Sequence, residues 1–313
     1  MEKDPLDARK LERLRQMAQL RGSSDLVEVT GQLLGALGLP AERVRPRDLA
    51  RKLSDDEVHG LMDGGASVGL IAEVWPLLAE AAAHVEGVEP AQFGASRHTR
   101  VAPGAEPRLQ WMEVAARAIG LTELVVHVGG ADNLTVVGID DAEPTLILGR
   151  GALAGDLASR FRAGRALYLL RQRAATVERL PMAQLDEILW AAAVLSGARS
   201  SGGDATALKA RAKAVSKAMG RRELKALENY GRRLEAESLD GHAWRAAVVR
   251  GADRFGLLVC GDAGAAVRAL AGRADAGLVD LRRPESLELV RFALDDRYAT
   301  LRRQVYGLTN GDG

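Results

Sequence analysis

The sequence contains few residues of the types and spacing that enzyme chemistry requires. Two of its five histidines, His98 and His127, together with Asp253, could form a new site only if the fold brought them together. His98 stands close to two arginines and could bind an anion, but a solvated loop position is the simpler interpretation. His127 is expected on the polar face or at the edge of a strand. These residues leave an enzyme as an alternative without assigning it a reaction.

The single cysteine and one Asp-His pair offer little further chemistry. Cys260 lies in an apolar run, which favours a buried structural thiol over a nucleophile. One cysteine also excludes an intramolecular disulfide and any structural zinc site that needs two thiolates. Asp240 and His242 could form a dyad, although an N-capping aspartate beside a surface histidine explains the pair more simply. The sequence matches neither a phosphate-binding loop nor a dinucleotide-binding loop, and it lacks a GxSxG nucleophile elbow.

A basic cluster lies between residues 209 and 225, where Glu223 is the only acidic residue. Lys213 and Lys217 share a helix face, and Arg221 extends that face at the same spacing. The simpler interpretation is a solvated helix face. The alternative is a surface for nucleic acid or an acidic partner, which the absence of interleaved aromatic residues disfavours. The residues that would form this surface are Lys209, Lys213, Lys217, Arg221 and Lys225.

The composition describes a chain with a sizeable apolar core and no overall electric field. At 313 residues the chain can bury roughly three quarters of its unfolded surface. Lys and Arg number 43 and Asp and Glu 42, so the formal charge of +1 attracts neither nucleic acid nor an anionic membrane. No stretch approaches the ~20 apolar residues of a membrane helix, and the start of the sequence has no signal-peptide core. We expect a cytoplasmic protein without a cofactor.

Residues 4–38 predict a helix pair. Apolar side chains recur at helical spacing on both sides of a Gly-Ser-Ser break at residues 22–24, and Gly38 ends the second helix. The length and the turn glycine resemble a single tetratricopeptide repeat, and a plain helical hairpin explains them equally well. Because the sequence starts abruptly with charged residues, we expect it to be the C-terminal part of a longer protein.

The rest of the chain is expected to be mainly helical. Pro76 must bend or divide a helix over 67–84, and residues 85–107 lack any period and predict a long loop. Three short strands at 123–128, 133–139 and 145–148, separated by Gly-Gly and Asp-Asp turns, predict an antiparallel meander. Further helices are expected at 109–119, 157–171, 182–195, 204–219, 221–237, 241–253, 264–270, 284–292 and 295–306, with a glycine and serine linker at 196–203 and an apolar run at 256–260.

Two distant segments define the centre of this body, TLILGRGALAGDLASRFRAGRALYLLR at 145–171 and GADRFGLLVCGD at 251–262. Their layout resembles the gluzincin metallopeptidases of the CAAX-prenyl-protease and HtpX-like group. In that group a P-x-I-x-V strand and a small-residue turn precede the HExxH helix, and a later helix carries E-x-x-A-D. Pro144 and the strand after it match the first pattern, and Ala252 with Asp253 matches the end of the second. The resemblance covers residues 111–270, and it is also similar to the tail domain behind tetratricopeptide repeats in some large bacterial proteins.

Every residue that would bind zinc in this family is replaced. Arg165 stands in place of the first His, Ala166 in place of the general base and Leu169 in place of the second His. Val249 stands where the third ligand would be. Because three ligands and the base are lost together, no metal site is left. The resemblance therefore implies an inactive, zinc-free peptidase-like fold.

Arg165 could compensate for the missing metal. A guanidinium group would occupy roughly the volume and the charge position of the lost zinc, and the resemblance brings the Asp253 carboxylate close to it. One hypothesis is therefore an ion pair between Arg165 and Asp253 that joins the two helices. In the alternative, Arg165 points to solvent and apolar side chains such as Leu167 hold the helices together.

The sequence thus predicts a mostly helical α+β protein. It divides into a tetratricopeptide-like helix pair (1–38), a helical segment with a loop (39–107) and a pseudo-metallopeptidase body with a small antiparallel sheet (108–313). The favoured function is a non-enzymatic interaction or scaffold module whose partner is another protein. The alternatives are an enzyme with a relocated site and a binder of nucleic acid or an acidic partner through residues 209–225.

Overall fold

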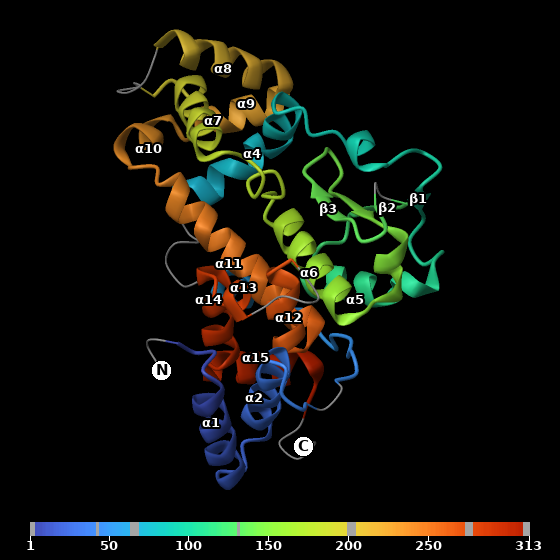
Figure 1. The fold of residues 1–313 in the computed structure, drawn as a ribbon. Coiled ribbons are helices and arrows are strands. Elements are labelled where there is room, and N and C mark those ends of the chain that lie inside the picture. Colours follow the sequence, from blue (N-terminus) through green and yellow to red (C-terminus); the bar gives the residue numbers. More distant parts are fainter. Residues whose placement is uncertain are drawn as a thin grey trace.

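The computed structural model describes residues 4–41, 44–62, 69–129, 132–198, 205–272 and 278–308. Within these ranges the chain is mostly helical and has one small four-stranded sheet, which confirms the predicted α+β class. Figure 1 shows α1 and α2 at one end, α7 to α10 at the opposite end, and the sheet at one side of the body. The helices are α1 (Ala8–Leu20), α2 (Ser24–Ala36), α3 (Asp55–Gly60), α4 (Leu70–Val85), α5 (Gln110–Ala118), α6 (Leu157–Arg171), α7 (Met182–Leu195), α8 (Ala205–Ala218), α9 (Arg221–Glu228), α10 (Gly231–Ala236), α11 (Gly241–Cys260), α12 (Ala263–Leu270), α13 (Leu278–Leu281), α14 (Pro284–Ala293) and α15 (Asp296–Tyr306).

Helices α1 and α2 form the predicted helix pair. Asp7 caps the start of α1 by accepting two backbone amides, and Gly22 turns the chain with a φ of 66° that favours glycine. Gln32 on α2 joins the pair to the body, because its amide oxygen accepts from the Ala263 amide of α12 at 2.8 Å. One packed pair is compatible with a terminal repeat and with a plain hairpin.

The sheet has the strand order β1-β2-β4-β3. Its strands are β1 (Arg100–Val101), β2 (Val125–Val128), β3 (Val136–Ile139) and β4 (Thr145–Leu148). The predicted antiparallel meander is wrong, because β2 pairs with β4 in parallel, while β1 pairs with β2 and β3 pairs with β4 antiparallel. All residues of β4 are buried, and such a strand is favoured at the centre of a sheet. Strand β1 lies in the segment predicted as a loop, since a pair of residues is too short to show a period.

Helices α6 and α11 share the most extensive helix contact of the body. Gly164 and Gly256 permit it, because a β-carbon on Gly164 would lie 2.9 Å from the Gly256 Cα. The sequence predicts that this helix ends at residue 253, before an apolar run. In the structure α11 continues to Cys260, and every residue from 251 onward is buried. Gly256 lies inside this helix, at the close contact with α6.

Helices α7 to α10 pack with α4 at the end of the molecule away from α1 (Figure 1). The sequence predicts one helix over 221–237, but α9 and α10 divide that span. A side chain on Gly231, at the start of α10, would collide with the Ser196 carbonyl oxygen, so the break permits a close approach to the end of α7. Helix α4 runs through Pro76 undivided. Residues 199–203 of the predicted linker lie outside the described residues.

A single apolar cluster contains residues from α1 to α15. Trp75 on α4 is fully buried at its centre, and its indole nitrogen donates to the Arg173 carbonyl oxygen at 2.7 Å. Its ring centre lies 5.3 Å from that of Trp244 on α11. Among the described helices, none combines the length and the apolar character that a membrane crossing requires. The domain division at residues 38 and 107 stays a prediction.

Candidate functional site

The candidate site lies where α6 packs on α11, at positions that the metallopeptidase resemblance assigns to zinc ligands. Arg165 on α6 donates from Nε to Asp253 Oδ1 on α11 at 2.5 Å. It also donates from Nη2 to Glu178 Oε1 at 2.6 Å. The hypothesised ion pair between Arg165 and Asp253 is therefore present, and it includes a second carboxylate that the sequence did not indicate.

The three charges of this network are largely withdrawn from water. The side chain of Arg165 is 18% exposed and that of Asp253 6% exposed, while Glu178 stands at the rim. Burial lowers the pKa of Arg165, but the charges of Asp253 and Glu178 outweigh burial and raise it. Burial raises the pKa of Asp253, and the guanidinium of Arg165 opposes that rise. The buried carboxylate thus depends on the guanidinium to remain charged.

Glu178 lies in the segment between α6 and α7. Hydrogen bonds to backbone oxygens of this segment hold it against α11. Arg245 on α11 donates to the carbonyl oxygens of Glu178 and Leu180. Arg173 turns the chain after α6 with a φ of 53°, unusual for a residue with a side chain. The segment shows no helical or strand period, so sequence reasoning had no signal for the role of Glu178.

The replaced peptidase positions on α6 converge on one cavity of about 230 Å³. Arg165, Ala166 and Leu169 line it together with residues of β3, of the segment after α6 and of α12. Ala166 and Leu169 are buried and give the cavity an apolar wall beside the ion pairs. Val249 is half-buried on α11 and precedes Asp253 by one helical turn, which places both on the same helix face.

The residues at this place do not fit a zinc ion. Zinc binds three or four side chains that offer lone pairs, but Arg165 is a cation and Ala166 and Leu169 carry no donor atom. Asp253 already accepts from Arg165. Across the described ranges, no three His, Cys, Asp or Glu side chains are grouped as a metal site requires. The arrangement joins the two helices through a charged hydrogen bond.

His98, His127 and Asp253, the residues of the enzyme alternative, each contact a different partner. His127 on β2 lies 3.1 Å from the Thr99 hydroxyl through Nδ1, and burial lowers its pKa. His98 is exposed, and its Nε2 accepts from Arg97 Nε at 3.1 Å. Asp253 is paired with Arg165. The structure therefore provides these residues with no common metal-binding group in the part of the chain that it describes.

The simpler interpretations of Cys260 and of the Asp-His pair are confirmed. Cys260 is fully buried, and burial raises the pKa of its thiol to about 12, which disfavours the reactive thiolate. Asp240 caps α11 by accepting from the Ala243 amide at 2.8 Å. His242 is exposed beside it.

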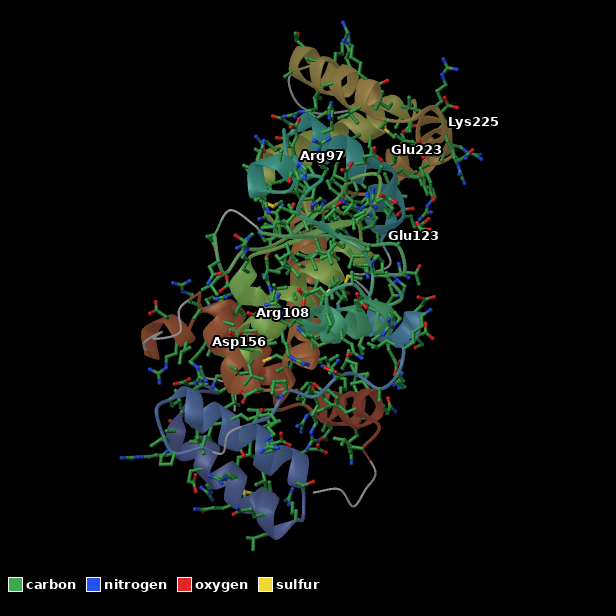
Figure 2. The ribbon with its side chains drawn as sticks, turned by 90° about the vertical axis from the view of Figure 1, so that its right-hand side faces the viewer. Arg97, Arg108, Glu123, Asp156, Glu223 and Lys225 are labelled. Carbon is green, nitrogen blue, oxygen red and sulfur yellow. The ribbon has the colours of Figure 1, made fainter. Side chains whose placement is uncertain are left out.

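The basic cluster lies on the surface of α8 and α9, at the end of the molecule where Figure 2 labels Lys225 and Glu223. Arg211 is withdrawn from it by ion pairs with Glu86 and Glu187. The remaining members are exposed and form no ion pair among the described residues. They are Lys209, Lys213, Lys217, Arg221 and Lys225.

Asp140, directly after β3, is a buried acid that sequence reasoning missed. The residue has no exposed surface, and its Oδ2 accepts from the Thr176 amide at 2.9 Å. Within the described structure, its Oδ1 and the Thr176 hydroxyl have no hydrogen-bond partner. Burial raises the pKa of Asp140 from 3.8 to about 6, although the Thr176 amide, Arg173 and Arg179 favour the charged form.

Replacing Asp140 with asparagine is expected to stabilise the protein near pH 8 and to change little near pH 4. Between pH 3.8 and about 6 this residue binds more protons in the folded state than in the unfolded state, so wild-type stability falls as the pH rises through that window. Asparagine removes the charge, which corresponds to a gain on the order of 2 kcal/mol above the window. Urea unfolding of both proteins across the pH range measures the difference. A difference that does not vary with pH would contradict this explanation.

The Arg165 network and the cavity beside it lie next to each other in the fold. Three of the replaced peptidase positions line one cavity, and Asp253 of the second pattern is bound to one of them. Comparisons of the chain with protein-family models, with curated proteins and with solved structures found no match.

Proposed function

We propose that this chain is a non-enzymatic protein-interaction module built on a body that resembles a zinc-free metallopeptidase. The observation that carries the proposal is the Arg165 network. A cation tied to Asp253 and Glu178 stands where the resemblance would put the zinc ion. A metal cation beside it would meet like charge, and its carboxylate ligands would first have to leave the guanidinium.

Helices α6 and α11 run in opposite directions where they pack. Gly256 packs against the side chain of Arg165, whereas Gly251, earlier on α11, packs against Tyr168, later on α6. The two helices therefore run antiparallel. A body that holds ligands on two helices of opposite direction needs this kind of close and fixed contact.

Helix periodicity brings the remaining replaced positions together. Leu169 follows Arg165 by one turn of α6, and Val249 precedes Asp253 by one turn of α11. Because Arg165 faces Asp253 and the helices are antiparallel, we expect Leu169 to face Val249. The positions of the first, second and third ligand then lie on one helix-helix contact.

Restoring the lost side chains tests the resemblance. The variant Arg165→His/Ala166→Glu/Leu169→His/Val249→Glu is expected to bind about one zinc ion per chain, because it supplies three ligands of the family's types. The wild-type chain, purified without chelator, is expected to contain no stoichiometric transition metal. Mass spectrometry of the digested proteins measures the metal content, and circular dichroism checks that the variant is folded.

The single variant Ala166→Glu is the matched control, since it adds the acid without any of the imidazole ligands. A folded restored variant without zinc would contradict the peptidase-like geometry. A stoichiometric metal in the wild-type chain would show an unrecognised ligand set, and the enzyme alternative would then replace the proposal. The exposed cluster on α8 and α9 keeps nucleic acid or an acidic partner as the second candidate.

A further inference from the structure

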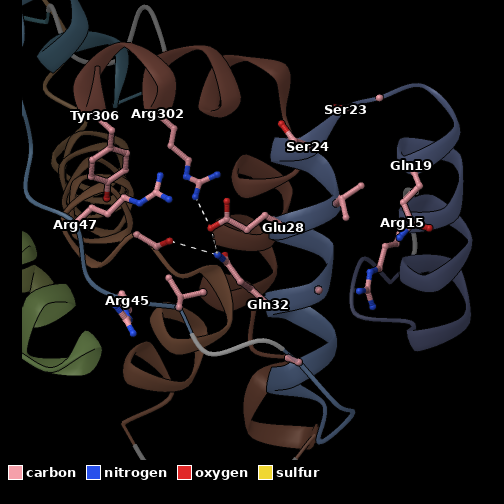
Figure 3. Close-up of a pocket in the computed structure, with 16 residues that line it drawn as sticks. Arg15, Gln19, Ser23, Ser24, Glu28, Gln32, Arg45, Arg47, Arg302 and Tyr306 are labelled. Carbon is pink, nitrogen blue, oxygen red and sulfur yellow. Dashed lines mark hydrogen bonds and ion pairs between the residues drawn. The ribbon is translucent and has the colours of Figure 1, made fainter. Parts of the chain in front are cut away.

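A groove of about 840 Å³ opens between the α1–α2 pair, residues 44–47 with Ala41, and α15 (Figure 3). It shares no residue with the cavity at Arg165. Four arginines and only one acid, Glu28, line its described part, so this part of the groove is basic although the whole chain is nearly neutral. The arginines are Arg15, Arg45, Arg47 and Arg302.

Glu28 does not neutralise this groove, because it is already engaged. Its Oε1 accepts from Arg302 Nη2 at 2.5 Å and from Gln32 Nε2 at 3.0 Å. The side chain of Arg302 is 2% exposed and also pairs with Asp25, yet its Nε has no hydrogen-bond partner within the described structure. These ion pairs balance the charge of Arg302 inside the fold.

The other three arginines form no ion pair among the described residues. Arg45 and Arg47 are exposed, and Arg15 lies half-buried against Gly31 of α2. Figure 3 shows Arg47 and Arg302 directed toward the same part of the groove, with Arg15 on the other side of α2. Guanidinium groups that face one space repel each other, and a bound anion would replace that repulsion by attraction.

Uncharged hydrogen-bonding groups accompany the arginines. Ser23 and Ser24 line the groove at the start of α2, and the side chain of Ser23 makes no capping hydrogen bond. Gln19 of α1 adds an amide. Guanidinium, hydroxyl and amide groups are the donors with which proteins bind phosphate oxygens.

We propose that this groove binds a small molecule that carries more than one phosphate group. Arginine binds phosphate through paired N–H donors, which matches the guanidinium groups of Arg15 and Arg47, since neither has an ion pair with a described residue. These two come from different elements that line the groove, so a ligand with separated anionic groups can use both. The volume of about 840 Å³ is within the range of small-molecule sites. The groove is independent of the Arg165 network and of the interaction function proposed above.

Calorimetric titration of the full chain with inorganic triphosphate, pyrophosphate and orthophosphate tests this proposal. We expect one-to-one binding of triphosphate at about 150 mM salt, and weaker binding of the shorter ions because they reach fewer arginines. Arg15→Gln and Arg47→Gln are each expected to weaken triphosphate binding by roughly tenfold or more. Neither side chain has an ion pair within the described fold, so both variants are expected to fold normally.

Two substitutions at Gly31 distinguish an effect of charge on binding from an effect on folding. A β-carbon there would lie 3.9 Å from Arg15 Cζ, an ordinary contact, so Gly31→Glu offers Arg15 an internal carboxylate. We expect Gly31→Glu to abolish triphosphate binding and Gly31→Gln, of equal size and without charge, to retain more of it. Arg13→Gln is the control outside the groove, since Arg13 is exposed elsewhere on α1 and is expected to leave binding unchanged.

Equal triphosphate affinity in the wild type and in the double variant Arg15→Gln/Arg47→Gln would overturn the proposal. Loss of binding in Lys213→Gln/Lys217→Gln alone would also overturn it, because the anion would then bind to α8. A polyglutamate peptide that binds more tightly than triphosphate and competes with it would assign the groove to an acidic protein segment instead.

Discussion

Replacing Arg165 with alanine is expected to lower the free energy of unfolding by about 3–5 kcal/mol, the cost of leaving a buried charge without its partner. Asp253 is 6% exposed and loses its one ion-pair partner among the described residues, at 2.5 Å, and Glu178 loses the same guanidinium. The truncated side chain also stops packing along Gly256. Urea unfolding followed by circular dichroism near neutral pH measures the change.

Two further variants show whether charge causes this loss. Arg162→Ala is the control on the same helix, because Arg162 forms no ion pair among the described residues. Arg165→Met/Asp253→Asn removes both charges and keeps most of the volume, so it is expected to be more stable than Arg165→Ala. A thermal midpoint that Arg165→Ala leaves unchanged would show that the pair contributes nothing to stability.

Replacing Gly256 with alanine is expected to cost about 3 kcal/mol, near the upper end of ordinary overpacking. The added β-carbon would lie 2.8 Å from the Phe161 carbonyl oxygen and 2.8 Å from Arg165 Cγ. A backbone oxygen cannot rotate away as a side chain can, so α6 and α11 must separate. The separation would also lengthen the hydrogen bond between Arg165 and Asp253. Chemical denaturation of the purified variant measures this cost.

Gly60→Ala is the matched control for that experiment. Gly60 lies in α3, and a β-carbon there would meet no atom within 4 Å, so alanine is expected to leave stability unchanged or to raise it by a few tenths of a kcal/mol. Equal effects of the two substitutions would contradict the account of Gly256 as a packing residue. A second test is Gly164→Ala, which is expected to act in the same direction because its β-carbon would press on Gly256.

Local patterns in the sequence predicted the helices better than the sheet. The helical period identified the α1–α2 pair and α7, since each has apolar residues on a face that the core covers. The same reasoning ended α11 early, because residues 256–260 are uniformly apolar and do not continue the helical period. The parallel pairing of β2 with β4 was missed, since turn residues show where strands end but not which strands become neighbours.

The candidate site was predicted only where the resemblance supplied a long-range relation. Arg165 and Asp253 are 88 positions apart, and no local pattern could have paired them. Glu178 was missed, because it lies in a segment without a period. The arginine groove was missed for the same physical reason, as Arg15, Arg47 and Arg302 come from separate segments that meet only in the fold.

The ion pairs of Arg302 have a consequence for the biosynthesis of the chain. Asp25 and Glu28 precede Arg302 by 277 and 274 positions. At a translation rate of roughly 5–20 residues per second, α2 leaves the ribosome tens of seconds before its partner in α15 exists. For most of this interval the Ala263 amide that donates to Gln32 has not been synthesised, and the later helices that cover the apolar side of α2 are also missing. A nascent chain is therefore expected to present the α1–α2 pair to chaperones until its last helices have been made.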